Sequence, residues 1–182
     1  MKRYFRKMRG THKSPPRKPV SKILWSWFGA FVGIYLVAHM SHLFATSATD
    51  NLFLIGSFGA SAVLLYGAPR VEYAQPRNLV GGHILSALVG ITVYKLMPGN
   101  IELASALAVS LAVVVMHYSK TIHPPGGATA LIAVIGSNQV HALGYLFVLS
   151  PVLLGASVLL LVALVANNLS ANPKRHYPVF WW

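Results

Sequence analysis

The sequence predicts an all-α membrane protein: a compact helical bundle of six membrane segments, four full spans and two short broken helices, arranged as a 3+3 inverted repeat. Composition is the first observation, because 55% of the 182 residues are hydrophobic and only 10% are charged, against about 25% in an ordinary soluble domain. So few polar residues cannot coat a soluble domain of this size, which places the chain in a membrane. The other two observations are a set of six apolar segments and a short repeat within them.

Residues 1–22 come first and carry nine of the 15 Lys and Arg residues. Three prolines and few apolar residues accompany these charges, which predicts a disordered cytoplasmic tail. A basic tail can bind nucleic acid. We favour a topology anchor beside anionic lipid headgroups and expect no nucleic-acid partner, because an apolar segment begins immediately after the tail.

Six apolar segments follow and make up a transmembrane domain over residues 23–168. A full span needs about 20 residues, with a lower limit near 17, and four segments meet this need. The second and fifth contain Gly-Ser-Phe-Gly and Pro-Pro-Gly-Gly near their starts, which leaves each a helix of about half the hydrocarbon thickness. The six segments are 23–45, 52–69, 79–96, 101–118, 124–137 and 142–166.

The distribution of charge predicts the topology. If all six segments cross and the N-terminal tail is cytoplasmic, fourteen of the 15 Lys and Arg residues lie inside and only Lys95 lies outside, as the positive-inside rule requires. Re-entry of the two short segments would move Arg70 and Arg77 outside, so we favour crossing. We therefore expect an integral protein of a bacterial inner membrane, with both termini cytoplasmic and a short basic and aromatic tail at 169–182.

A hexapeptide repeat links the two short segments. Residues 59–64, Gly-Ala-Ser-Ala-Val-Leu, match residues 127–132, Gly-Ala-Thr-Ala-Leu-Ile, at three identical and three conservative positions. Each copy lies between two full helices, so residues 23–98 and 99–168 form two repeats of three segments. Three crossings are an odd number, so the second repeat enters the membrane inverted. This pattern is typical of secondary transporters and channels.

Small residues recur at four-residue spacing on the full helices. Such stripes let helix backbones approach each other in lipid, either within one chain or between the copies of a homo-oligomer. The stripes are Gly29 and Gly33; Gly82, Ser86 and Gly90; and Ala104, Ala108 and Ala112.

Residues 120–132, Lys-Thr-Ile-His-Pro-Pro-Gly-Gly-Ala-Thr-Ala-Leu-Ile, place helix-breaking residues where a lipid-facing helix would have leucine. Broken backbone at membrane depth must be buried in protein or line a wet cavity. Prolines suit a helix entrance and glycines allow close approach. The helix N-terminus would direct free N–H groups and a partial positive charge into the bundle. The equivalent start near Gly59 would come from the opposite side, so we expect a small-anion site near the midplane.

The candidate anion-binding residues lie at these two helix starts and beside them. His83 and His123 could relay a proton, or they could be structural residues that bond local backbone. Arg77 could attract an anion to the cytoplasmic mouth or mark topology beside a headgroup, and Asn78 could cap the third helix. The candidates are Ser57, Gly59, Ala60, Ser61, His123, Pro124, Pro125, Gly126, Gly127, Thr129, His83, Arg77 and Asn78.

Three acids lie at segment ends or in loops, which argues against a cation site: Asp50, Glu72 and Glu102. His39 and His42 share a helix face, but no carboxylate or cysteine completes a metal site beside them. No acid–base set stands beside the hydroxyls of the short helices. We therefore expect no metal, no cofactor and no enzymatic activity.

Residues 123–131 and the stretch Ala-Gln-Pro-Arg-Asn-Leu-Val-Gly-Gly-His-Ile-Leu-Ser-Ala-Leu-Val-Gly at 74–90 resemble the HPP family of small integral membrane proteins. The resemblance extends over about residues 23–168, and the family is named for the His-Pro-Pro found here at 123–125. It implies a compact helical membrane domain, often described as four-spanning, and some members are linked to nitrite transport. We expect a transporter or channel for a small inorganic anion, with nitrite first. The alternative is a non-transporting anchor or sensory module.

Overall fold

The computed structural model describes residues 2–10, 12–44 and 55–182, and these described residues contain helices and no strand. The all-α prediction is therefore confirmed. Four helices are long and apolar enough to cross a membrane, and they are the four predicted full spans: Val20–Met40, Pro76–Leu96, Ile101–Tyr118 and Val148–Asn168. The predicted segment limits at 45 and 52, and Asp50, lie outside the described residues.

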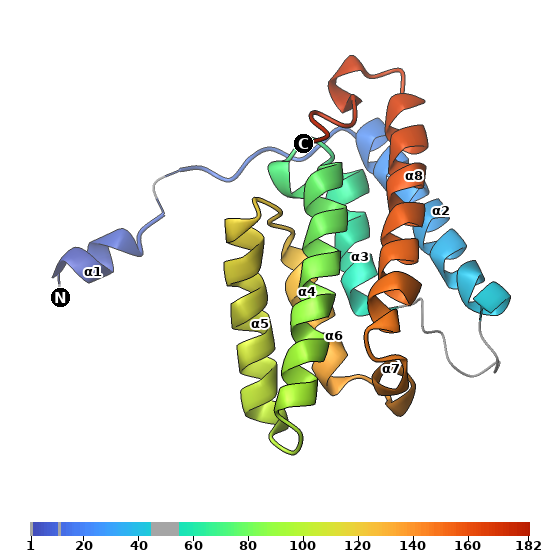
Figure 1. The fold of residues 1–182 in the computed structure, drawn as a ribbon. Coiled ribbons are helices and arrows are strands. Elements are labelled where there is room, and N and C mark those ends of the chain that lie inside the picture. Colours follow the sequence, from blue (N-terminus) through green and yellow to red (C-terminus); the bar gives the residue numbers. More distant parts are fainter. Residues whose placement is uncertain (1, 11, 45–54) are drawn as a thin grey trace.

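Along the chain, successive membrane helices run in alternating directions (Figure 1). The helices of the first half are α1 (Lys2–Lys7), α2 (Val20–Phe44), α3 (Gly56–Ala62), the π-helical turn η1 (Val63–Gly67), the 3-10 turn η2 (Glu72–Ala74) and α4 (Pro76–Leu96). The helices of the second half are α5 (Ile101–Tyr118), α6 (Pro124–Ile135), α7 (Asn138–Leu143), the π-helical turn η3 (Val148–Leu153), α8 (Leu154–Asn168) and the 3-10 turn η4 (Pro173–Arg175).

The start of α4 differs from the prediction. The helix begins at Pro76 rather than Leu79, and Gln75 is its N-cap residue. Proline suits the first helical position because its missing N–H would have no partner there. The Asn78 side chain does not cap the helix; its Nδ2 donates to the Ile122 carbonyl at 2.8 Å. The predicted capping role of Asn78 is therefore wrong.

The last predicted segment, 142–166, is not one helix. Residues 138–143 form the separate helix α7, and Ser150 has non-helical backbone angles within η3. Gly144, with a positive φ of 53°, ends α7. Pro151, which cannot donate a helical hydrogen bond and crowds the preceding turn, accounts for the break at Ser150. The regular helix α8 begins only at Leu154.

The small-residue stripes pack within the chain. A Cβ atom placed on Gly29 or Gly33 would meet the ring of Tyr66, whose hydroxyl donates to the Leu159 carbonyl at 3.1 Å. A Cβ atom on Gly90 would lie 2.5 Å from the carbonyl oxygen of Ala130 on α6. The stripe on α5 is likewise buried, at Ala104, Ala108 and Ala112. The glycines of α2 therefore make room for the Tyr66 ring, and Gly90 lets α4 and α6 approach backbone to backbone.

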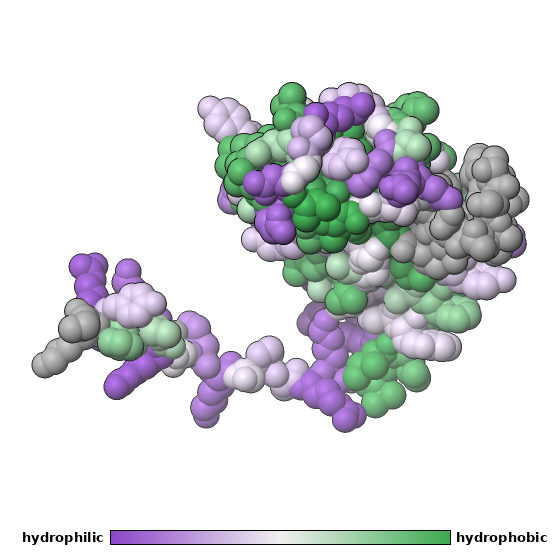
Figure 2. Space-filling model, turned by 90° about the horizontal axis from the view of Figure 1, so that it is seen from below, coloured by the Kyte–Doolittle hydropathy of each residue, from purple (hydrophilic) through white to green (hydrophobic). Residues whose placement is uncertain are grey.

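Large apolar side chains cover the outside of the bundle, as expected for a surface in lipid. They include Phe31 and Tyr35 on α2, Val113 and Val114 on α5, and Leu161 on α8, all of them exposed. The N-terminal segment is different: Figure 2 shows it as a largely hydrophilic run that projects away from the bundle. The short helix α1 lies in this segment and was not predicted.

The chain gathers its positive charge at one end of the bundle, which we call the basic end. Helices α2 and α4 begin there, and α5 and α8 end there (Figure 1). Lys22, Arg70, Arg77, Lys120 and Lys174 lie in or beside these helix ends, and Lys95 lies at the opposite end of α4. The arrangement agrees with the charge asymmetry read from the sequence.

Candidate functional site

Two imidazoles lie in the centre of the bundle. His83 comes from the second turn of α4, and His123 is the N-cap residue of α6. Their ring centroids are 4.8 Å apart and their planes are inclined by 60°. Both side chains are fully buried, and the ring of Phe58 packs edge-on against His83 at 5.3 Å. The sequence named both histidines and did not predict that they touch.

The hydroxyl of Ser61 on α3 joins the two rings. Its Oγ atom lies 2.8 Å from Nε2 of His83 and 2.8 Å from Nε2 of His123. Ser61 is itself fully buried. One hydroxyl can accept one hydrogen bond and donate another, so Ser61 can serve both imidazoles at once.

The other ring nitrogens bond outward. Nδ1 of His83 lies 2.7 Å from Oγ1 of Thr129, and Nδ1 of His123 lies 2.7 Å from the Tyr73 carbonyl oxygen. A carbonyl only accepts, so the neutral His123 carries its hydrogen on Nδ1 and accepts from Ser61 at Nε2. The donors then run in one direction, from Thr129 through His83, Ser61 and His123 to Tyr73. We call these four side chains the central cluster: His83, His123, Ser61 and Thr129.

The central cluster can rearrange its hydrogens. The Ser61 hydroxyl also has the Ser57 carbonyl as an acceptor at 3.1 Å. If a proton joins His123, both of its nitrogens become donors, and the Ser61 hydrogen can turn to Ser57. The cluster can therefore accept a proton without leaving a donor facing a donor.

Glycines on α4 and α6 allow the imidazoles to meet. A Cβ atom on Gly82 would lie 2.5 Å from the His123 Cβ, and one on Gly126 would lie 2.7 Å from Ser86 Oγ and 2.9 Å from the Gly82 carbonyl oxygen. Real Cβ atoms do not approach so closely, so only glycine fits at both positions. The close α4–α6 contact therefore depends on Gly82 and Gly126.

Two further hydroxyls in these helices have no hydrogen-bond partner. Ser57 Oγ and Ser86 Oγ are buried and unpaired. Ser57 lies one turn before Ser61 on α3, and Ser86 lies three residues after His83 on α4. Buried polar atoms are normally paired. These two hydroxyls are not, so they have the capacity to bond a small ligand. Ser86 was predicted only as a packing residue, although its spacing from His83 could have identified it.

The start of α6 offers fewer donors than the sequence suggested. Pro124 and Pro125 occupy its first two positions and have no N–H group. The Gly126 N–H donates to the His123 carbonyl at 2.7 Å. The partial positive charge of the helix end remains. The imidazoles and hydroxyls, rather than backbone N–H groups, supply most of the polar atoms in the centre.

Several candidate residues lie apart from the central cluster. Gly59 and Ala60 are exposed, and a Cβ on Gly127 would meet only Val109 Cγ1, at 3.8 Å. The Arg77 guanidinium lies 5.4 Å from the centre of the Phe180 ring. Asn78 bonds the loop before α6.

The Tyr73 carbonyl belongs to a loop that the C-terminal segment holds in place. The hydroxyl of Tyr177 donates to the Ala74 carbonyl at 2.8 Å, and the Val179 N–H donates to Gln75 Oε1 at 2.7 Å. Tyr177 is buried, and burial raises the pKa of its phenol. The phenol therefore stays a neutral donor, and the loop keeps its carbonyl directed at His123.

The arrangement also places a base beside a hydroxyl nucleophile, which the sequence did not predict. Ser61, His123 and the Tyr73 carbonyl form a hydroxyl–imidazole–acceptor series. Acyl transfer additionally needs donors for an oxyanion. Ser61 is the sixth residue of its helix, so its own N–H bonds the preceding turn. The N–H of Ser61 is therefore not free to bond an oxyanion.

The sequence profile described as "HPP, transmembrane region" matches residues 15–178. The chain belongs to the HPP family. This HPP chain is similar to two transmembrane proteins of Dictyostelium discoideum. One is 49% identical over 182 residues, which cover 98% of this chain and 57% of the relative. The other is 45% identical over 184 residues, which cover 98% of this chain and 63% of the relative.

The family predicted from residues 123–131 is confirmed. The HPP chain spans about three-fifths of the length of these two relatives. No solved structure matches the chain. The central cluster lies within the residues that the family profile matches.

Proposed function

We propose that this HPP protein is a transporter or channel for a small inorganic anion, and that the ion passes through the central cluster. One observation carries the proposal. Ser61 and Thr129 occupy the same position in the two matching hexapeptides, and they bond opposite nitrogens of His83. Two matching short helices that meet on one side chain near the midplane are typical of transporter binding sites.

The second support is the arrangement of the helices, which we propose to be an inverted repeat. Helices α2, α3 and α4 alternate in direction, and so do α5, α6 and α8 in the opposite sense (Figure 1). The packing is consistent with this pairing: α5 packs on α4 and α6, while α2 packs on α8 and η1. The first helix of each half, α2 or α5, therefore contacts the short segment of its own half and the last helix of the other half.

The side chains of the central cluster suit reversible binding of an anion, as transport requires. Its side chains include no carboxylate and no fixed cation. A proton on either imidazole would add a positive charge and convert a lone pair into a donor. Neutral donors bind an anion weakly, whereas a protonated pair binds it more strongly, so uptake would be proton-coupled. The HPP resemblance makes nitrite the first anion to test.

In the conformation described here, all four cluster side chains are shielded from solvent. An ion therefore reaches them only after α3 or α6 moves relative to α4. Such alternating access is the usual behaviour of transporters with paired short helices.

We also propose that the basic end faces the cytoplasm, because the positive-inside rule then holds for fourteen of 15 basic residues. The predicted bacterial inner membrane and the predicted homo-oligomer stay predictions. The relatives described above come from Dictyostelium discoideum.

The test is uptake of nitrite, nitrate, formate and chloride into proteoliposomes at two external pH values. We expect nitrite uptake above that of empty liposomes, increasing as external pH falls. His83→Gln should reduce uptake at least about tenfold, equivalent to roughly 1.4 kcal/mol. His117→Gln, on the exposed face of α5, is the matched control and should retain uptake.

The outcomes separate the alternatives. Equal flux of all four anions would favour a channel that selects mainly by size. Normal uptake by His83→Gln would contradict the proposed path. No flux of any anion would favour the non-transporting anchor or sensory module.

A further inference from the structure

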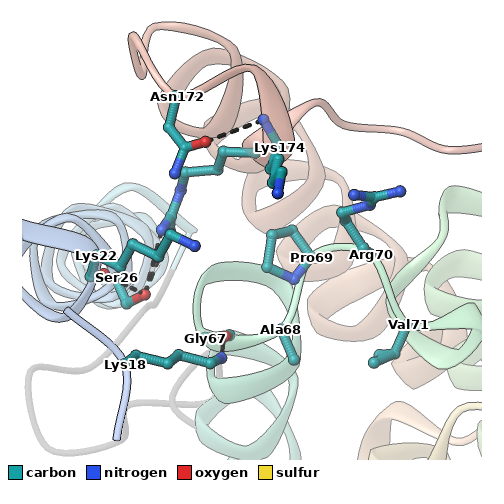
Figure 3. A pocket seen from close by; sticks show the side chains of 11 residues that line it. Lys18, Lys22, Ser26, Gly67, Ala68, Pro69, Arg70, Val71, Asn172 and Lys174 are labelled. Carbon is teal, nitrogen blue, oxygen red and sulfur yellow. Dashed lines mark hydrogen bonds between the residues drawn. The ribbon is translucent and has the colours of Figure 1, made fainter.

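A second polar region lies at the basic end, away from the central cluster. It is a pocket of about 340 Å³, and we call it the basic pocket (Figure 3). Three parts of the chain form it: the start of α2, the loop after η1, and the turn after α8. Its polar and charged lining side chains are Lys18, Lys22, Ser26, Arg70, Asn172, Lys174 and Arg175.

The charge of the basic pocket is unbalanced. Five of its lining residues are Lys or Arg, and none is Asp or Glu. The whole chain has only three acids, and Glu72, two residues beyond Arg70, is not among the lining residues. Five positive side chains around one hollow repel each other unless an anion joins them.

Arg175 is the buried part of this charge, with 7% of its surface exposed. Its guanidinium donates to the Tyr66 carbonyl at 2.6 Å, to Asn167 Oδ1 at 3.0 Å and to Ser26 Oγ at 3.4 Å. All three acceptors are neutral. Burial lowers the pKa of Arg175, because a cation without a counter-charge is costly away from water. An anion in the pocket would offset this cost.

The other four cations fall into two groups. Lys18 is already bonded, since its Nζ donates to the Gly67 carbonyl at 2.6 Å (Figure 3). The side chains of Lys22, Arg70 and Lys174 line the same pocket and make no hydrogen bond to a described residue. Three side chains with free donors therefore line the pocket together with Arg175 and Lys18. A dianionic phosphate group accepts several such bonds at once.

The position and size of the pocket indicate where that phosphate comes from. The basic end is one end of the four helices long and apolar enough to cross a membrane, so we expect it at the level of the lipid headgroups. A neighbouring hollow shares Lys22, Asn172 and Arg175 and adds Trp25, and Trp side chains are enriched at membrane interfaces. The volume lies in the range of small-molecule sites, about 300–1,000 Å³, and exceeds what inorganic phosphate alone would fill.

We propose that the basic pocket binds a phosphomonoester carried on the headgroup of an anionic membrane lipid. The proposal is independent of anion transport, because no pocket residue belongs to the central cluster. It also differs from general attraction of the N-terminal tail to anionic membranes, since Arg70, Lys174 and Arg175 lie far from the tail in sequence.

The test is native mass spectrometry of the full chain in detergent, titrated with phosphatidic acid, phosphatidylserine or phosphatidylcholine, or with inorganic phosphate alone. We expect a saturable single adduct with phosphatidic acid that is tighter than with the other two lipids. Arg175→Gln removes core hydrogen bonds as well, so it is not the decisive variant. Arg70→Gln combined with Lys174→Gln removes only free donors and should weaken phosphatidic acid binding about 30-fold, at about tenfold per 1.4 kcal/mol and roughly 1 kcal/mol per charge.

The matched control is Lys13→Gln combined with Lys120→Gln, which removes two cations outside the pocket. This variant should change the affinity less than about twofold. Equal weakening by both double variants would reduce the effect to diffuse surface charge and overturn the proposal. Equal affinity for phosphatidylserine, or an equally tight adduct with inorganic phosphate, would also overturn it, as would the absence of a saturable adduct.

Discussion

The short segments α3–η1 and α6 carry matching hexapeptides and contribute unequally to the same cluster. Ser61 on α3 bonds two imidazoles, whereas Thr129 on α6 bonds one. The N-cap residues of the two helices also differ, because one is apolar and the other is polar. The N-cap of α3 is Ile55, which lies in the apolar core, and the N-cap of α6 is His123. Similar backbones have thus acquired different chemistry, and one half supplies the bridging hydroxyl that the other half's histidine needs.

The largest effect should follow removal of the bridging hydroxyl. Ser61→Ala leaves Nε2 of both His83 and His123 unpaired, at about 1–3 kcal/mol for each buried group. We expect a marked fall in the thermal unfolding temperature of the purified protein in detergent. Ser57→Ala, one turn away on the same helix, removes a hydroxyl without a partner and should leave the temperature nearly unchanged. Equal effects of the two variants would mean that the bridge contributes nothing.

The second effect tests the glycine pair that opens α6. Gly126→Ala would force a Cβ against Ser86 Oγ and the Gly82 carbonyl, and overpacking of this kind costs about 1–3 kcal/mol. Gly127→Ala has room and should stabilise the helix by about 0.5–1 kcal/mol. The same unfolding assay compares them. Matching shifts for the two variants would contradict the close α4–α6 contact.

The smallest effect should come from Thr129, whose hydroxyl bonds one imidazole rather than two. Thr129→Val keeps the side-chain shape and leaves only Nδ1 of His83 unpaired, so we expect a loss of about 1–2 kcal/mol. Thr129→Ser, which retains the hydroxyl, is the control. If Thr129→Val destabilised the protein more than Ser61→Ala, the unequal roles of the two hydroxyls would be reversed.

The sequence was sufficient for the features that depend on length and composition. The four full spans, the two short helices and the concentration of basic residues at one end all follow from apolar runs and charge counts. Helix starts were less predictable, because Pro76 begins α4 three residues early and Pro151 interrupts the last segment. Those limits depend on local backbone geometry that hydropathy does not encode.

The site was predicted as a set of residues and not as an arrangement. His83, His123, Ser61 and Thr129 were all named, but their mutual contacts arise from side-chain directions on three different helices. The sequence argument emphasised backbone N–H groups and named Gly126 and Gly127 without distinguishing them. In the structure the prolines remove donors, and Gly126 provides the close approach. The basic pocket could not be predicted, because its lining comes from three distant stretches of chain.

Residues 177–179 bond the loop before α4, and this loop in turn bonds His123, so a change at the C-terminal segment can affect the centre of the bundle. Tyr177 and Val179 anchor the residues directly after Tyr73, and the Tyr73 carbonyl is the acceptor for His123. A bulky tag, a covalent modification or a docked protein that displaces this segment would make the position of the Tyr73 carbonyl less fixed. His123 would then lose the acceptor of its Nδ1 hydrogen, and an event at residues 177–179 would reach the central cluster.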